Sequence, residues 1–395
     1  MTPSIGGLDT LLAVVLVAAL APAIVAVLPG KIPQVVVLIF GGILIGPQAL
    51  GIGNPRSISL LADIGLGFLF LMAGYELEPG QLRQRSGRLA IVGWIASAAL
   101  SVGIVALLTA TGFVHDFVPI GLALTTTALG TLLPILQEED MLSGDFGKYV
   151  LAAGAVGELF PIVAISIFLT GRKEYVAFAS LVVVLGAALL LTAAPHLLGE
   201  SRLRALVRQG QRATAQTTLR WSIVLLVVLL TLAAHFGLDV VLGAVLAGIV
   251  LRRWTNRMGD IEPLENKLEA VGYGVFIPLF FVSSGMSLDI RSIIHNPLRL
   301  VVFVVLLLVV RGLPSLLVYA RVLPFRERVE MTFITATTMP LLIALAAIGL
   351  SDGVMLPSNA AALVGAGVVS VLVFPAVATL VRRTRRSSSD PGSDE

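Results

Sequence analysis

Cysteine is absent from this sequence, and charged residues are scarce. Without cysteine the chain can form neither disulfide bonds nor thiolate metal sites. Asp, Glu, Lys and Arg make up only 13% of the 395 residues, whereas soluble domains usually carry about 25%. Because hydrophobic residues reach 57%, the chain cannot cover itself with a polar surface. These shortages exclude a soluble protein and indicate an integral membrane protein.

Motifs of the common enzyme classes are missing as well. The chain has no glycine-rich phosphate-binding loop, no HExxH zinc motif and no arrangement of residues typical of a catalytic nucleophile. The sequence therefore predicts that the protein is not an enzyme, requires no cofactor and binds no nucleic acid.

Long apolar segments follow one another almost from end to end of the chain. A helix needs about 17–25 predominantly apolar residues to cross the hydrocarbon core of a bilayer. The pattern predicts an all-α integral membrane protein, in contact with lipid, with about 13 transmembrane helices. The predicted spans are 9–28, 33–49, 57–76, 89–112, 117–136, 147–170, 175–197, 221–236, 239–252, 269–287, 300–320, 329–349 and 359–381.

The placement of the basic residues predicts the orientation of the chain. If the N-terminus lies outside, 21 of the 27 lysines and arginines fall on the inner side, 5 fall on the outer side and one lies within a span. This bias follows the positive-inside rule. We therefore expect a cytoplasmic C-terminus, preceded by a disordered, charged and serine-rich tail at 382–395.

Three pairs of segments resemble each other across the chain. The fifth and twelfth spans contain threonine-rich segments, LTTTALGTLLPIL (124–136) and ITATTMPLLIAL (334–345). The third and tenth spans contain LFLMAGYEL (69–77) and FFVSSGMSL (280–288), and the second and ninth spans match more weakly. Each pair lies seven spans apart, so its members cross the membrane in opposite directions. Two inverted six-helix repeats are typical of secondary transporters.

Residues that break helices lie in two of the repeated spans. Gly130 and Pro134 occur in the fifth span, and Pro340 occurs in the twelfth. Freed backbone groups at membrane depth are tolerated only where protein or a watery cavity satisfies them. We therefore expect two discontinuous helices that cross at an ion- and proton-binding site. The alternative is that proline only kinks a packed helix. The threonines expected to line the crossing are Thr126, Thr127, Thr337 and Thr338.

Glu158 and Arg311 lie near the middle of predicted spans. The apolar run around Glu158 extends over 149–171 without another charge, although a carboxylate at the centre of a membrane helix costs at least about 2.5 kcal/mol. The two residues could simply neutralise each other, but hydrophobic residues of similar volume would serve stability as well. We predict that Glu158 binds a proton and a monovalent cation in turn, with Arg311 as its charge partner. Mutually exclusive occupancy of one carboxylate is sufficient for antiport.

Several segments resemble the monovalent cation/proton antiporter superfamily, especially its Kef-type and NapA-type branch. The segments that carry the resemblance are IFGGILIGPQALGIG (39–53), LADIGLGFLFLMAGYEL (61–77), the threonine-rich fifth span, FIPLFFVSSGM (276–286) and TATTMPLLIALAAIG (335–349). The resemblance implies the sodium/proton antiporter fold, a homodimer, and a core that carries the site between the two faces in an elevator motion. The implied parts of the membrane domain 1–381 are a dimerisation part (about 1–80 and 221–290), a core transport part (about 89–170 and 300–381) and a linker helix (about 175–197).

By this resemblance, Glu158 takes the position of the ion-binding aspartate of the family's polar pair. Gly157 replaces the first member of that pair, and Arg311 falls where the family has a basic residue. A single carboxylate favours electroneutral exchange. The sequence therefore predicts an inner-membrane antiporter that exchanges Na⁺ or K⁺ for H⁺ in pH homeostasis. Three alternatives stay open: a proton symporter for an organic anion with Arg311 as the clamp, a channel-like cation pathway, and a non-transporting sensor or assembly protein.

Overall fold

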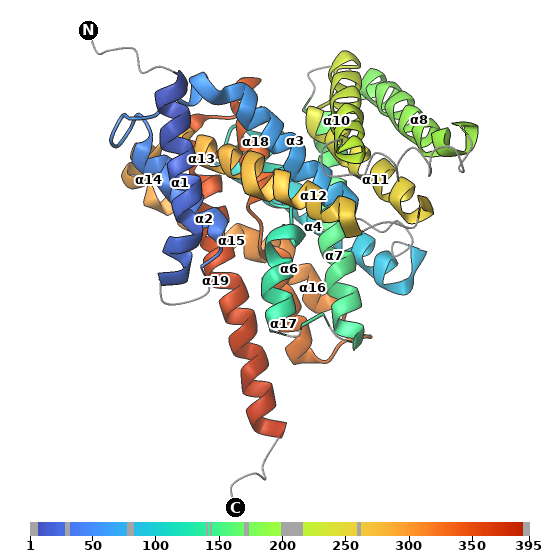
Figure 1. The fold of residues 1–395 in the computed structure, drawn as a ribbon. Helices are drawn as coiled ribbons and strands as arrows, with labels where there is room; N and C mark the ends of the chain where they lie inside the picture. Colours follow the sequence, from blue (N-terminus) through green and yellow to red (C-terminus); the bar gives the residue numbers. More distant parts are fainter. Residues whose placement is uncertain are drawn as a thin grey trace, which may run out of the picture. The chain divides into compact units, whose positions relative to one another are not determined.

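The structure of the chain is a computed structural model in which every regular element of the described residues is a helix (Figure 1). The described residues are 7–27, 32–76, 83–139, 141–142, 144–169, 174–198, 216–258 and 262–389. The chain forms two compact units. Unit 1 comprises 1–24, 38–77 and 162–287, and unit 2 comprises 25–37, 78–161 and 288–395.

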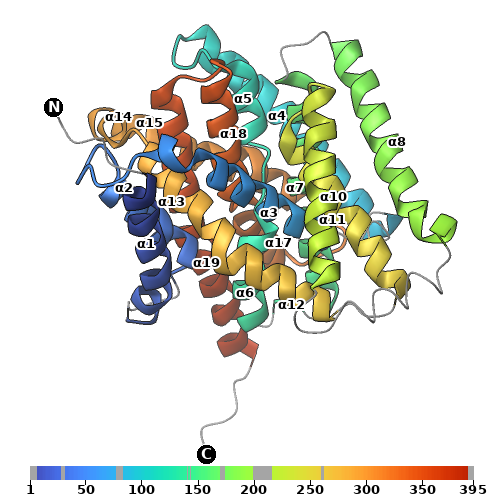
Figure 2. The ribbon, with the colours of Figure 1, turned by 45° about the horizontal axis from the view of Figure 1, so that its top comes forward.

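Unit 1 contains most of the first three helices and the helices in the middle of the chain. They are α1 (Gly7–Val27), α2 (Gln34–Ile45), α3 (Ser59–Glu76), α8 (Glu174–Leu198), α10 (Thr217–His235), α11 (Val240–Met258), α12 (Glu262–Val271) and α13 (Ile277–Ser287). A π-helical turn, η3 (Gly272–Phe276), joins α12 to α13, and Figure 2 shows the three elements following one line.

Unit 2 contains the helices that begin at Arg85 and those that follow Ser287. They are α4 (Arg85–Ala110), α5 (Phe117–Ala123), α6 (Leu129–Glu138), α14 (Ile290–His295), α15 (Pro297–Leu307), α16 (Leu313–Val318), α17 (Phe325–Ala336), α18 (Pro340–Ser351) and α19 (Pro357–Ser389). A second π-helical turn, η4 (Leu308–Gly312), joins α15 to α16. The helix α7 (Gly144–Phe168) is divided between the units: its residues up to Pro161 belong to unit 2, and those from Ile162 belong to unit 1.

The thirteen predicted spans all coincide with helices. Ten helices or helix combinations of the described residues are long and apolar enough to cross a membrane. The other three predicted spans fall on α2, on α5 together with α6, and on α11. The fold class is thus an all-helical membrane protein, while the number of helices that cross the bilayer stays a prediction.

The last helix is longer than the sequence predicts. α19 continues to Ser389 and so enters the segment 382–395 that was expected to be disordered. The segment has neither glycine nor proline before Pro391, and a residue that precedes proline is disfavoured in a helix. Residues 390–395 lie outside the described residues.

Glycines bring α2 and α13 of unit 1 into backbone contact. A Cβ atom added at Gly42 of α2 would overlap the carbonyl oxygen of Val282 of α13. In return, a Cβ atom added at Gly285 of α13 would overlap the carbonyl oxygen of Ile39 of α2. Membrane helices that approach this closely use small residues because lipid gives no hydrophobic force between helices, and van der Waals packing must hold them together.

The same contact recurs between α3 and α11. A Cβ atom at Gly74 of α3 would overlap the carbonyl oxygen of Val245, and one at Gly248 of α11 would overlap that of Leu71. The sequence repeat relates α2 to α11 and α3 to α13. The contact of α2 with α13 is therefore repeated as the contact of α11 with α3, and the glycines are the repeated positions.

Candidate ion and proton site

The fifth predicted span consists of two short helices in unit 2, α5 and α6. Thr126 Oγ1 donates a hydrogen bond of 2.7 Å to the carbonyl of Ala123, the last residue of α5. The hydroxyl of Thr126 thus caps the last carbonyl group of α5. The chain is not helical again until Leu129. Gly130 and Pro134 lie inside α6, so the interruption precedes both residues that the sequence analysis named as its cause.

The twelfth predicted span is interrupted where the sequence predicts. α17 ends at Ala336, Thr337 has an extended backbone (φ −73°, ψ 120°), and Pro340 opens α18. Proline is favoured at the first position of a helix because its missing N–H would have no partner within that helix.

The two interrupted segments are hydrogen-bonded to each other and to their neighbours. The amide of Ala128 donates to the carbonyl of Thr337, at 2.9 Å. The amide of Thr127 donates to the carbonyl of Gly157 on α7, at 3.0 Å. The amide of Thr338 donates to Ser370 Oγ on α19, at 3.1 Å. Backbone groups freed by the interruptions thus find partners inside unit 2, as a buried break requires.

All four predicted threonines are buried at the crossing. Their exposed fractions are 0% for Thr126, Thr337 and Thr338 and 1% for Thr127. Thr126 Oγ1 and Thr338 Oγ1 share a hydrogen bond of 2.7 Å, so one hydroxyl from each repeat meets the other. Thr337 Oγ1 instead donates to the carbonyl of Phe333 on its own helix, at 2.9 Å.

Arg311 is held in the same network. It lies in the π-helical turn η4 and is only 2% exposed. Its Nε donates to Thr127 Oγ1 at 2.8 Å, and its Nη2 donates to the carbonyl of Ala153 at 3.0 Å. Thr127 Oγ1 in turn donates to the carbonyl of Thr335 at 2.6 Å. π-Helical turns within α-helices often mark functional sites, and here the turn carries the buried cation of the crossing.

Glu158 lies on α7, directly after Gly157, whose carbonyl accepts the Thr127 amide. Its side chain is half-buried. The carbonyl of Ala153 accepts from Arg311, and that of Gly157 accepts from Thr127. The turn of α7 before the carboxylate is therefore tied to η4 and to the interrupted fifth span. A carboxylate in such a place can hold either a proton or a hard monovalent cation.

Two residues of this network were missed by the sequence analysis. Thr335 donates its hydroxyl to the carbonyl of Met331, 2.8 Å away, and its own carbonyl receives the Thr127 hydroxyl. Ser370 bonds both the amide and the carbonyl of Thr338. Thr335 belongs to the threonine-rich segment of the twelfth span, so the sequence pattern that indicated Thr337 and Thr338 also included it. Ser370 is flanked by apolar residues of α19, and no local pattern distinguishes it.

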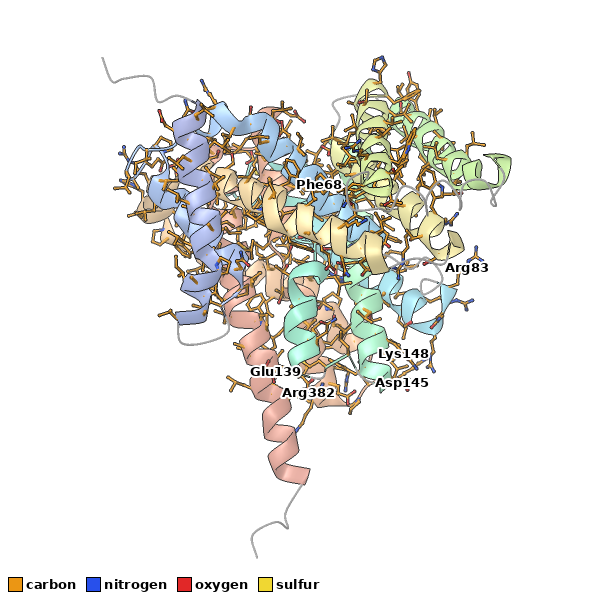
Figure 3. The ribbon with its side chains drawn as sticks, viewed as in Figure 1. Phe68, Arg83, Glu139, Asp145, Lys148 and Arg382 are labelled. Carbon is orange, nitrogen blue, oxygen red and sulfur yellow. The ribbon has the colours of Figure 1, made fainter. Side chains whose placement is uncertain are left out.

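The sequence analysis also missed a fully buried carboxylate. Glu330 of α17 is 0% exposed, and its Oε2 lies 3.7 Å from Nη1 of Arg382. Figure 3 labels Arg382 on α19. Glu330 lies one residue inside its predicted span, where a charge is expected at the interface. The structure buries it where α17 packs against α19.

The chain resembles known proteins in its sequence. The sequence model of a family described as "Sodium/hydrogen exchanger, transmembrane" matches residues 15–382. The chain belongs to this family. The match extends over both repeats and over every predicted site residue, and it confirms the resemblance to monovalent cation/proton antiporters.

Individual family members are similar over most of the chain. The YjbQ protein of Bacillus subtilis (strain 168) is 27% identical over 93% of this chain and 62% of its own length. The protein named "Probable Na(+)/H(+) antiporter 3" of Methanocaldococcus jannaschii is 25% identical over 88% of this chain and 90% of its own. The glutathione-regulated potassium-efflux system protein KefC of Escherichia coli is 26% identical over 89% of this chain. The chain spans only 57% of KefC.

A solved structure confirms the fold. The sodium proton antiporter MjNhaP1 of Methanocaldococcus jannaschii superimposes with a TM-score of 0.66 at 18% identity, and the match covers 95% of each chain. The predicted sodium/proton antiporter fold is therefore correct.

Proposed function

We propose that the chain is a secondary active transporter that exchanges Na⁺ or K⁺ for H⁺ by alternating access. The observation that supports it most is the bond of α7, just before Glu158, to the interrupted segment at Thr127, which is itself bonded at Ala128 to the interrupted segment of the other repeat. Such a crossing is the place where secondary transporters bind substrate and coupling ion. The names of relatives, which include Na⁺/H⁺ antiporters and a potassium-efflux protein, favour the same substrates.

Glu158 is the group that the two ions share. A proton and a monovalent cation compete for one carboxylate, so each turnover releases one and binds the other. Arg311 keeps its charge throughout, since a guanidinium does not lose its proton under working conditions. The site gains one positive charge with either ion, and the exchange is therefore electroneutral.

The two units are assigned different parts in this transport cycle. Unit 2 carries Glu158, Arg311 and both interrupted helices, and we assign it the moving core of an elevator mechanism. Unit 1, with its glycine-mediated helix contacts, is assigned the dimerisation scaffold. Following the positive-inside bias, the N-terminus lies outside and the C-terminus lies in the cytoplasm, in a cell inner membrane.

The experiment that tests this function is ion exchange in proteoliposomes that contain an internal pH dye. Na⁺, K⁺ and Li⁺ are added in turn, with and without a clamped voltage. Glu158→Gln should reduce exchange at least about 100-fold, since an amide can neither carry the proton nor balance the cation. Rates that do not change with voltage would support electroneutral exchange.

A matched control lies on the same helix. Asp145 of α7 has an 81% exposed side chain and lies 2.9 Å from Lys148 (Figure 3), so Asp145→Asn should leave exchange unchanged. Full exchange by Glu158→Gln would refute the proposed role of the carboxylate. Transport of an organic anion that survives Glu158→Gln and fails with Arg311→Leu would instead favour the symporter.

A further inference from the structure

Position 157 has no room for a side chain. A Cβ atom built on Gly157 would lie 2.7 Å from Nη2 of Arg311 and 2.6 Å from Oγ1 of Thr127. Neither distance is attainable for a carbon atom without movement of its neighbour, because carbon and nitrogen or oxygen atoms make van der Waals contact only beyond about 3 Å. Any residue other than glycine must therefore displace the guanidinium or the threonine.

The guanidinium cannot move aside easily. Its hydrogen bonds to Thr127 Oγ1 and to the carbonyl of Ala153 tie it to the crossing and to α7. The backbone that carries it is also packed tightly, because a Cβ atom at Gly312 would lie 2.7 Å from the carbonyl oxygen of Thr332 on α17. Breaking a buried hydrogen bond of a charged group is costly, so the arginine is anchored from both ends.

Packing alone does not account for this glycine. Gly154, one turn earlier on α7, is also closely packed, but its nearest neighbour is the apolar end of Leu129, with Cδ1 2.6 Å from an added Cβ atom. Gly154 therefore serves contact between helices. Gly157 faces a buried charge and its hydrogen-bond acceptor, directly before the carboxylate of the proposed site.

We propose that Gly157 is a specificity-determining position: by carrying no side chain, it admits the guanidinium of Arg311 as a fixed positive charge in the space where a side chain at 157 would lie. This inference rests on the proposed antiport at Glu158 and adds to it. The guanidinium of Arg311 takes the space that a second ligand for the transported ion would need at position 157. It leaves one carboxylate to bind one monovalent ion and repels a divalent cation.

The test is a double-mutant cycle between positions 157 and 311. Gly157→Asn should reduce the exchange rate about tenfold in the wild-type background, because overpacking a buried site costs about 1–3 kcal/mol. In the Arg311→Met background, the same change should reduce the remaining rate clearly less, since the guanidinium is gone and only the contact with Thr127 opposes the added side chain. Equal losses in both backgrounds, or no loss in either, would overturn the proposal.

A second measurement separates charge placement from simple damage to the fold. We expect that removing or displacing the guanidinium favours the proton on Glu158, because a positive charge bonded to the preceding turn of α7 stabilises the ionised carboxylate. Both Arg311→Met and Gly157→Asn should therefore move the pH profile of exchange to higher pH. Gly154→Ala should lower the rate without moving the profile and should show no coupling to Arg311→Met. A profile that Gly157→Asn leaves in place would contradict the specificity role.

Thermal unfolding of the same purified variants distinguishes this inference from the proposed function. If the wild type exchanges no ions, antiport is refuted, but coupling between Gly157→Asn and Arg311→Met in the unfolding temperature would still support the steric part. If the wild type exchanges ions and no coupling occurs in either measurement, the inference fails and antiport stands. Should Arg311→Met not fold, Arg311→Lys, which lacks the planar guanidinium, takes its place in the cycle.

Discussion

In unit 1 the repeated segments meet through glycines, whereas in unit 2 they meet through hydroxyls, freed amides and one guanidinium. Gly42 and Gly285 join α2 to α13, and Gly248 and Gly74 repeat that contact between α11 and α3. In unit 2, the hydroxyls of Thr126 and Thr338 meet where the interrupted helices cross. Segments related by the inverted repeat thus form an apolar contact in unit 1 and a polar contact in unit 2.

The difference teaches which changes should affect stability and which should affect transport. Backbone-to-backbone contact through glycine has no polar group that could bind an ion, so its disruption should weaken folding only. A network of hydroxyls around a buried charge can hold an ion but contributes little packing. Substitutions in unit 1 should therefore change the unfolding temperature, and substitutions at the crossing should change the exchange rate.

Among the changes that compare the two units, the largest effect is expected for Gly248→Ala in unit 1. The added methyl group would overlap the backbone of α3 at Leu71, and such overpacking costs about 1–3 kcal/mol of unfolding free energy. Thermal unfolding in detergent measures this loss. The control is Gly103→Ala on α4, where nothing lies within 4 Å of the added atom, so the unfolding temperature should not fall. If Gly248→Ala both lowers the unfolding temperature and shifts the pH profile of exchange, the expected separation of stability from transport between the two units is wrong.

A smaller effect is expected for Thr127→Val in unit 2. Valine has the same shape but leaves Nε of Arg311 without the acceptor 2.8 Å away, and a buried donor without its partner costs about 1–3 kcal/mol. We expect the exchange rate in proteoliposomes to fall about tenfold. Thr127→Ser keeps the hydroxyl and should retain most of the rate. Equal rates for the valine and serine variants would show that the hydroxyl does not position the arginine.

The smallest effect is expected for Thr126→Val. This change removes the hydroxyl contact between the two repeats, but that bond joins two neutral groups and is weaker than a bond to a charged group, so the exchange rate should fall only about twofold. Thr125→Val is the matched control, because Thr125 Oγ1 donates to Leu122 of its own turn, at 2.8 Å. A larger loss for Thr125→Val than for Thr126→Val would contradict the importance of the contact between repeats.

Prediction from the sequence succeeded where the signal was local. Apolar length predicts a helix whatever its neighbours are, so every predicted span coincides with a helix or a pair of helices in the structure. Pro340 also acts within its own helix and was placed correctly. Gly130 and Pro134 were misplaced as breakers because α5 ends through the bond of Thr126 to Ala123 and through partners of Thr127 and Ala128 on other segments.

The sequence by itself determined that this chain enters a membrane and how its spans repeat in opposite directions. It also determined that Glu158 is a carboxylate in the middle of a long apolar run. Each of these follows from hydrophobicity and spacing along the chain, which no later contact can change. Only the tertiary structure decided where the guanidinium of Arg311 lies. Its neighbours Thr127, Ala153 and Gly157 come from distant segments, and packing in three dimensions alone brings such atoms within bonding distance.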